Sequence, residues 1–289
     1  MNDVSVIGTG AMGSALANAL AHSGAVVTVW NRSRAKAEAL TNPNVGSAES
    51  VAEALSASPL VIISVTDQEI ARSLVKQAGL DLDGRVLAST SFVTLDQAKA
   101  YDAMVREMGG RYLDLSIPAY PNEVRSQSGV FLLSGDRSAY EEHHRWFERI
   151  SRTATFVDET PGAAYLSEMA VLLAYLPMAV GLLQGLRVCE HHKLPVEWFR
   201  NLALELYPFH IRSLLDRVAE QPDSSARNVE ASVDQWRQGA KEYADYLQEM
   251  GLDRGMYDAL HALFIAASEA GRGGVDWTCI AEHAVKRSS

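Results

Sequence analysis

The 289-residue sequence predicts an α/β fold in its first half, a doubly wound sheet, followed by a long helix and an all-helical carboxy-terminal domain. Strand-like apolar runs alternate with helical segments up to residue 160, a pattern typical of a mostly parallel sheet covered by helices on both faces. After Pro161 the apolar spacing is helical almost without interruption. We therefore expect a sheet domain at 1–160, an interdomain helix at 161–190 and a helical domain at 191–289.

Short apolar and β-branched runs mark the strands of the first half, and Ala-rich or amphipathic segments between them mark its helices. The expected strands are Val4–Ile7, Ala25–Trp30, Leu60–Val65, Val86–Ser89, Tyr112–Ile117, Val130–Leu133 (a hairpin strand) and Ala154–Val157. The expected helices are Ala11–Ala21, Ser33–Leu40, Asp67–Gln77 and Asp96–Met108.

The second half divides into helices at proline and glycine breakers. These helices are expected at Gly162–Glu190, Pro195–Glu220, Ala226–Met250, Arg254–Ala270 and Trp277–Lys286. Pro208 lies inside the second of them and predicts a kink, because proline removes one backbone hydrogen bond.

The composition is that of an ordinary globular protein, with 47% hydrophobic and 21% charged residues. A formal net charge of -10 argues against a general binder of nucleic acid or of anionic membranes, because such proteins need a basic surface. Two cysteines, Cys189 and Cys279, are too few for a disulfide scaffold and are interpreted as thiols. The amino terminus has no signal-peptide pattern, so we expect a cytoplasmic protein.

One segment permits a second interpretation. Residues 169–186 contain no charged side chain and are long enough to span a bilayer. The segment also contains Pro177, Gly181, Gln184 and Gly185, and it begins beside Glu168. A helix that is apolar on all sides can equally be buried in protein, and we favour that interpretation.

A glycine-rich motif follows the first strand. Gly8, Gly10 and Gly13 form a G-x-G-x-x-G pattern, with Ala11 and Met12 at the start of the next helix. Such glycines allow a tight turn, the approach of a pyrophosphate and close packing of helix on strand, while the helix amino terminus supplies N–H donors. The context predicts a Rossmann-type dinucleotide site. The alternative is a structural turn without a ligand.

The end of the second strand indicates which dinucleotide binds. An acid there would bind the ribose hydroxyl of NAD, but the sequence has Asn31, Arg32, Ser33 and Lys36. Two cations and a hydroxyl can surround a 2'-phosphate, so we predict NADPH as the cofactor. The alternative is a solvated first helical turn, although cations there oppose the helix dipole.

Two later strands end in polar residues on the same predicted edge of the sheet. Val65, Thr66 and Thr90 are therefore expected to flank the ribose and nicotinamide. For the neighbouring Asp67 and Ser91, helix capping is an equally good interpretation.

These residues resemble the β-hydroxyacid dehydrogenase superfamily, and within it the NADPH-dependent imine reductases and reductive aminases. The resemblance rests on Val-Ile-Gly-x-Gly-x-Met-Gly at 6–13, Trp-Asn-Arg-Ser-x-x-Lys at 30–36 and the Pro161-Gly162 entry to the long helix. It extends through Tyr112-Leu113-Asp114, Leu133-Ser134-Gly135 and the closing helices. It implies a homodimer in which the carboxy-terminal helices wrap the partner's long helix and complete its cleft.

One position separates the chemistries within the superfamily. Hydroxyacid dehydrogenases have a lysine six residues after Gly162 and an asparagine three further on, where this chain has Glu168 and Val171. A carboxylate there opposes a developing alkoxide but pairs with an iminium cation and orients it. Imine reductases usually carry aspartate or tyrosine at this position, so glutamate is a departure that keeps the acid.

The sequence therefore predicts NADPH-dependent reduction of C=N bonds, imine or iminium to amine, with reductive amination from a carbonyl and an amine as an extension. Glu168 is the expected acid or cation anchor. Tyr165 and Tyr175 share its helix face and are candidate secondary donors, or else core aromatics. No metal site is predicted. The alternatives are a carbonyl reductase of the hydroxyacid dehydrogenase type and a non-catalytic NADPH-binding module.

Overall fold

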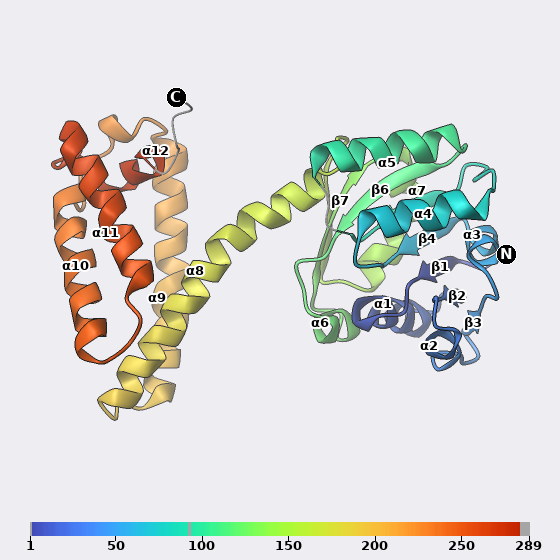
Figure 1. Ribbon diagram of the computed structural model, residues 1–289, viewed down its shortest axis with the longest axis horizontal. Helices are drawn as coiled ribbons and strands as arrows, with labels where there is room; N and C mark the ends of the chain where they lie inside the picture. The colour runs from blue at the N-terminus through green and yellow to red at the C-terminus, as the bar shows by residue number, and fades with distance from the viewer. Residues whose placement is uncertain (1, 92–93, 284–289) are drawn as a thin grey trace. The chain divides into compact units, whose positions relative to one another are not determined.

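The computed structural model describes residues 2–91 and 94–283 (Figure 1). It divides into two compact units, Met1–Ala174 and Tyr175–Ser289, with helix α8 (Ala163–His191) crossing the division. The last residues of the helix expected at Trp277–Lys286 lie outside the described part.

The first unit contains a sheet with the order β3-β2-β1-β4-β5-β6-β7-β8. All neighbouring pairs are parallel except β6 and β7, which are antiparallel as expected for a hairpin. The order reverses after β1, which makes the sheet doubly wound and confirms the predicted fold class. The strands are β1 (Val4–Ile7), β2 (Val27–Trp30), β3 (Val45–Ser47), β4 (Leu60–Ile63), β5 (Val86–Ser89), β6 (Arg111–Ser116), β7 (Val130–Gly135) and β8 (Thr153–Asp158).

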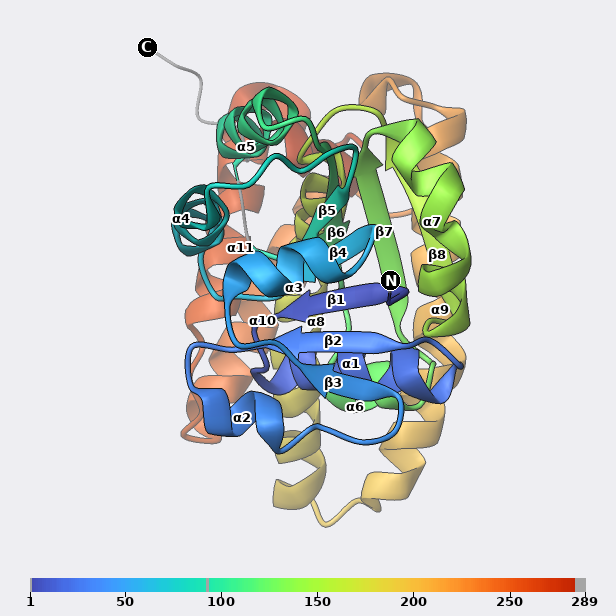
Figure 2. The same ribbon diagram turned by 90° about the vertical axis from the view of Figure 1, so that its right-hand side faces the viewer.

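Helices cover both faces of this sheet (Figure 2). Leu16 of α1, Val124 of α6 and Phe147 of α7 belong to the core on one face. Helices α3, α4 and α5 supply Leu55, Val75, Tyr101 and their neighbours to the core on the other face. The bounds are α1 (Ala11–His22), α2 (Arg34–Glu38), α3 (Val51–Ala57), α4 (Gln68–Ala78), α5 (Leu95–Glu107), α6 (Pro121–Arg125) and α7 (Arg137–Arg149).

Several short elements of the first unit were not predicted. Strand β3 has three residues, one of them Gly46, and therefore carries no alternating pattern. Helices α3, α6 and α7 were also missed, since α6 has five residues and α7 buries only one stripe of an otherwise charged sequence. Strand β4 ends at Ile63, two residues before the predicted end.

The second unit consists of the later part of α8 with α9 (Val196–Glu220), α10 (Val233–Glu249), α11 (Gly255–Ala267) and α12 (Ile280–His283). The predicted start of α10 at Ala226 was wrong by seven residues. The helix begins at Val233 with Ser232 as its N-cap. The Ser232 hydroxyl accepts a hydrogen bond from the Gln235 backbone N–H, and the Gln235 side chain accepts one from the Ser232 backbone N–H, which together form a capping box. Pro208 lies inside α9, which continues through it.

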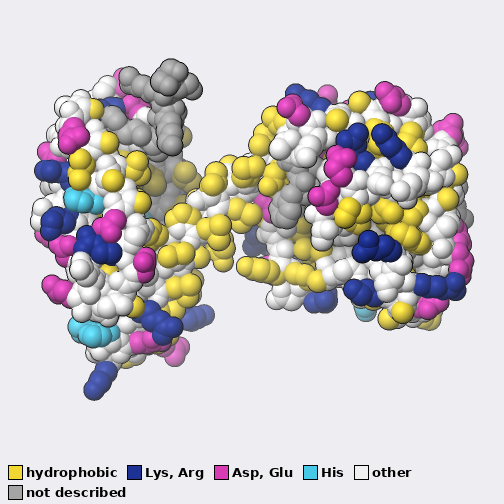
Figure 3. Space-filling model, in the orientation of Figure 1, with side chains coloured by type: hydrophobic (Ala, Val, Ile, Leu, Met, Phe, Trp, Pro, Cys, Tyr) yellow, Lys and Arg dark blue, Asp and Glu magenta, His cyan; other side chains and the backbone are white. Residues whose placement is uncertain are grey.

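Helix α8 leaves an apolar surface exposed on the single chain. Val171, Leu173 and Leu183 are 63%, 70% and 63% exposed. Figure 3 shows hydrophobic side chains gathered over this helix. Among the described residues α8 is the one helix long and apolar enough to cross a membrane, and none of its most apolar stretch is buried. Helix α9 has no buried residue in the described chain, so both helices present unpartnered apolar side chains.

Candidate functional site

The loop between β1 and α1 cannot accept side chains at two of its three motif glycines. A Cβ atom on Gly13 would lie 1.9 Å from the Gly8 carbonyl oxygen, and one on Gly8 would lie 2.2 Å from the Ser64 carbonyl oxygen. Gly8 also has φ = +96°, a conformation that L side chains avoid. At Gly10, by contrast, the structure leaves open space within 4 Å. The loop is thus packed on its inner side and open at Gly10.

This open side fits a pyrophosphate. Gly10 caps α1 without a side chain, so the first N–H groups of the helix, including those of Ala11 and Met12, have no intrahelical acceptor. The buried hydroxyl of Thr9 has no hydrogen-bond partner among the described residues. The Thr9 backbone N–H donates to Asn31 Oδ1 at 3.2 Å, which holds the loop against the end of β2.

The cations after β2 are not equivalent. Arg34 pairs with Glu38 at 2.7 Å and also with Glu49, so two acids neutralise it. Arg32 and Lys36 are exposed, and neither forms an ion pair within the described ranges. With the exposed Ser33 between them, they match the cation and hydroxyl set that the sequence assigned to a 2'-phosphate.

The ends of β4 and β5 are linked across the sheet edge. Thr90 N donates to the Ile63 carbonyl at 3.0 Å, and Ser91 Oγ donates to the Val65 carbonyl at 3.0 Å. Val65 and Thr90 are half-buried and Thr66 is exposed, so all three remain at this edge.

The helix-capping interpretation is confirmed for Asp67, which caps α4, and is wrong for Ser91. Asp67 Oδ1 accepts from the backbone N–H of Glu69 at 2.6 Å at the start of α4. Helix α5 is capped by Thr94, whose hydroxyl and the Gln97 side chain form a capping box. Ser91 instead joins two strand ends, which a reading of local sequence does not reveal.

Glu168 lies on the second turn of α8 and is buried, with 7% of its surface exposed. The hydroxyl of Ser116, on β6, donates to Glu168 Oε2. Within the described residues no lysine, arginine or histidine pairs with this carboxylate. A buried carboxylate without a cationic partner is costly, so it is expected only where a ligand or a proton compensates its charge.

A second carboxyl group, which sequence reasoning missed, lies beside it. Asp114 on β6 is 1% exposed and accepts from the Tyr165 backbone N–H at 3.3 Å. Ser134 Oγ, on β7, donates to Asp114 Oδ2 at 3.5 Å and accepts from the Ala164 N–H at 3.0 Å. Burial raises the pKa of Asp114 to about 7, and the nearby charge of Glu168 acts in the same direction. The hydrogen bonds that Asp114 accepts from the Tyr165 N–H and from Ser134 act in the opposite direction but are outweighed.

A sequence signal for these residues did exist. Asp114 and Ser116 are polar residues that alternate with Leu113 and Leu115 in β6, and Ser134 follows an apolar run in β7. Alternation places Asp114 and Ser116 on one face of β6. Which helix covers that face was a matter of tertiary structure.

The two tyrosines of the predicted face have different environments. Tyr165 is half-buried, and its backbone N–H is held by Asp114. Tyr175, seven residues after Glu168 on the same continuous helix, is 43% exposed. The alternative of a core aromatic is therefore wrong for Tyr175 within the single chain.

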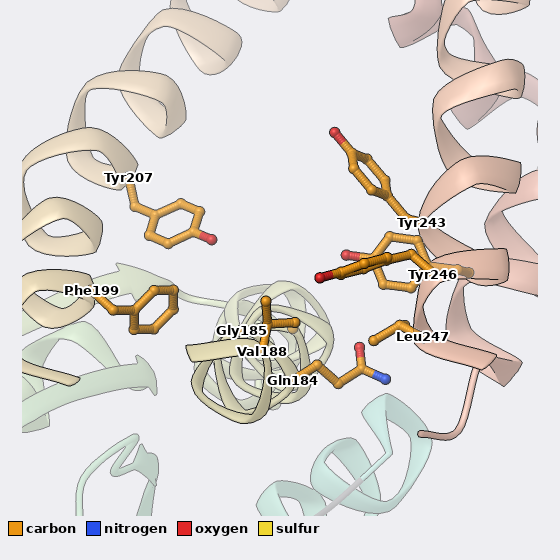
Figure 4. Close-up of a pocket in the computed structure, with 10 residues that line it drawn as sticks. Gln184, Gly185, Val188, Phe199, Tyr207, Tyr243, Tyr246 and Leu247 are labelled. Atoms are coloured by element: carbon orange, nitrogen blue, oxygen red, sulfur yellow. The ribbon is translucent and has the colours of Figure 1, made fainter. Parts of the chain in front are cut away.

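The second unit has a separate aromatic pocket of about 190 Å³. Figure 4 shows Phe199 and Tyr207 of α9 facing Tyr243 and Tyr246 of α10 across Gly185 of α8. Gln184 donates from Nε2 to the Asp253 carbonyl at 3.0 Å, and its Oε1 is buried without a partner among the described residues. The described residues contain no group of three or more His, Cys, Asp or Glu able to hold a metal ion.

Two families match the chain, one for each part. Residues 3–158 match the NAD-binding domain of 6-phosphogluconate dehydrogenase. Residues 160–286 match the carboxy-terminal domain described as NADPH-dependent reductive aminase-like. A curated relative, the NADPH-dependent reductive aminase of Aspergillus oryzae, is 23% identical over 97% of this chain and 96% of its own.

Two solved structures that match almost the whole of this chain have the same fold. An imine reductase from a Pseudomonas species is 28% identical, with a TM-score of 0.87 over 98% of this chain and 99% of that one. An imine reductase from Myxococcus stipitatus in complex with NADP+ is 25% identical, with a TM-score of 0.86 over 98% of this chain and 100% of that one.

Proposed function

The chain belongs to the family that joins a 6-phosphogluconate dehydrogenase-type NAD-binding domain to a reductive aminase-like carboxy-terminal domain, and from this premise we propose how it acts. It is an NADPH-dependent oxidoreductase that reduces C=N bonds, converting an imine or iminium ion to an amine. The observation that carries the substrate class is Glu168, a buried carboxylate with no cationic partner in the described chain.

NADPH supplies the hydride when it is bound. The residues that would hold its pyrophosphate are Gly8, Gly10, Ala11, Met12 and Gly13, with the free hydroxyl of Thr9 nearby. Arg32, Ser33 and Lys36 would hold the 2'-phosphate. Asn31 accepts the hydrogen bond from Thr9 N–H and so connects the glycine loop to the end of β2. Val65, Thr66 and Thr90 would flank the ribose and nicotinamide at the edge of the sheet.

Glu168 suits an iminium ion better than a ketone. An ionised carboxylate attracts the cationic nitrogen and fixes its orientation, whereas it repels the oxyanion that develops when a ketone is reduced. For a neutral imine, the protonated form of Glu168 can donate its proton to the nitrogen, so that one hydride and one proton are added in total. Ser116 donates a hydrogen bond to one oxygen of the Glu168 carboxylate. The hydroxyl of Tyr165, three residues before Glu168 on the same helix, is the secondary donor that we propose.

A spectrophotometric screen of NADPH oxidation tests this assignment. We expect turnover with cyclic imines, and with a ketone plus an amine. For 3-keto acids we expect a kcat/KM at least about 100-fold lower, because the carboxylate of Glu168 repels the substrate carboxylate. NADH should be a poorer reductant than NADPH. Efficient reduction of keto acids would instead favour a hydroxyacid dehydrogenase, and NADPH binding without turnover of either class would favour a non-catalytic module.

We further propose that the protein is a homodimer in which α8 of one copy is covered by carboxy-terminal helices of the other. Two observations support the dimer. Large apolar side chains are exposed on the single chain, among them Leu173, Leu183 and Phe209, the last of which is 67% exposed. Helix α9 has no buried residue in the described chain. Apolar surface of this extent is stabilised by a protein partner or by lipid. The two cysteines are buried and free, which fits the cytoplasm that we propose as the compartment.

Light scattering on the purified protein at micromolar concentration is expected to give twice the chain mass. Leu173→Glu combined with Leu183→Glu should shift the mass to that of one chain, because two buried charges would have no partner in the interface. Leu252→Glu, on a half-buried loop residue outside these helices, serves as a control for the effect of an added acid. A monodisperse monomer of the unmodified protein, or its binding to neutral lipid vesicles, would contradict the dimer.

A further inference from the structure

The first two turns of α8 lie over one face of the β6–β7 pair. Asp114 and Ser116 are two residues apart on β6, a spacing of about 6.7 Å along a strand. The residues that they contact, Tyr165 and Glu168, are three apart on α8, a rise of about 4.5 Å. Strand β6 thus binds the backbone of the first turn through Asp114 and the carboxylate of the next turn through Ser116.

We propose that Asp114 is a second carboxyl group of this site, an inference that rests on the proposed reaction at Glu168. Asp114 acts as a positioning residue, and its charge adds to the negative charge that attracts a cationic substrate. Its backbone contact fixes the turn that carries Glu168. Its own ionisation adds a second negative charge next to Glu168. The site then attracts an iminium ion more strongly when Asp114 is ionised than when it carries a proton.

The surroundings of Asp114 make this ionisation available near neutral pH. The pKa of Asp114 is about 7, raised mainly by burial. The ionisable group that acts on Asp114 is Glu168 of α8, whose charge raises the pKa of Asp114 further. On the same strand, burial raises the pKa of Tyr112 well above its usual value, and the charge of Asp114 raises it further. Strands β5 and β7 place Ser89 and Ser134 opposite Asp114 in register.

Two buried tyrosines on this side of the sheet, Tyr112 and Tyr101, have raised pKa values. Tyr101 of α5 packs on Tyr112 with ring centroids 5.1 Å apart, and burial raises the pKa of Tyr101 well above its usual value through loss of solvation. Both tyrosines are therefore neutral over the working range. No basic side chain of the described residues pairs with Asp114, so its charge is uncompensated until a cation binds.

The test uses a cyclic iminium ion with an alkylated nitrogen, whose charge does not change with pH, at saturating NADPH. For the unmodified enzyme, kcat/KM should rise about three- to tenfold between pH 6 and pH 8 as Asp114 ionises. Asp114→Asn keeps the acceptor for Tyr165 N–H but cannot ionise. It should match the unmodified enzyme at pH 6 and show no rise at pH 8.

A merely structural role would give a different result. Asp114→Asn would then lower kcat/KM by the same factor at every pH, and that outcome overturns the proposal, as does a variant profile that rises like that of the unmodified enzyme. Asp158→Asn is the matched control, since Asp158 is an exposed acid shortly before α8. It should leave the pH profile unchanged. If the unmodified enzyme fails to reduce any iminium ion, the proposed function itself is wrong.

Thermal unfolding provides a readout independent of the substrate. The folded-state pKa of Asp114, about 7, lies above the value of about 3.9 in an unfolded chain, so the folded state binds the extra proton. Its contribution to stability is complete below about pH 4 and is lost as the pH rises through 7. The Tm of Asp114→Asn should therefore gain several degrees relative to the unmodified protein between pH 5 and pH 8, and an unchanged difference would overturn the charge assignment.

Discussion

Replacing Glu168 by glutamine is expected to lower kcat for a cyclic iminium substrate by about 100-fold or more, because positioned acid and charge contributions are typically of that size. Glutamine has nearly the same shape and can still accept the hydrogen bond from Ser116, so the fold should persist. The effect should therefore appear in turnover while the Tm changes little. Steady-state kinetics at saturating NADPH, with circular dichroism melting on the same samples, measures both.

Two further variants define the role of this side chain. Glu168→Asp keeps the carboxylate one methylene shorter and should retain activity within about tenfold of the unmodified enzyme. Glu190→Gln removes an exposed acid of the same helix, one that pairs with Arg187 at the helix end, and should change neither kinetic constant. Full activity of Glu168→Gln would show that the carboxylate has no part in the reaction.

Replacing Gly13 by alanine is expected to produce the second large effect, a loss of stability in the first unit. Its methyl group would lie 1.9 Å from the Gly8 carbonyl oxygen, a backbone atom that cannot rotate away. The loop would have to shift, at a cost of about 2–4 kcal/mol. This corresponds to a Tm lower by about 5–15 °C for a unit of this size. Binding of NADPH, followed by its fluorescence, should be lost together with the loop geometry.

Gly10→Ala is the matched comparison, because it changes the same loop where the structure is open. Gly10 has φ = -70° and no atom within 4 Å of a Cβ position, so alanine should leave the Tm within about 1 °C. The methyl group would nevertheless occupy the side on which a pyrophosphate approaches, and the Kd for NADPH should rise by about tenfold or more. Equal losses of stability in both variants would contradict the packing described for this loop.

The sequence was sufficient wherever local pattern carries the information. The glycine loop, the strands around it and the long apolar helix were predicted because each depends on residues within one or two dozen positions. Short elements such as β3 were missed, since three residues including a glycine carry no periodicity. The predicted start of α10 was wrong because the helical spacing of apolar residues extends back to Ala226, whereas Ser232 and Gln235 form the capping box at which the helix begins.

For the candidate site too, local sequence predicted some residues and only tertiary structure identified the others. Glu168 stood out from the sequence because a carboxylate in an apolar helix is expensive, and Arg32 with Lys36 because cations at a helix start oppose its dipole. Tertiary structure alone decided that Arg34 is neutralised by Glu38 and Glu49, and that Asp114 lies with Glu168 on one side of the sheet. These groups are up to 54 positions apart along the chain, and only the packing of strand and helix brings such distant charges into one low-dielectric site.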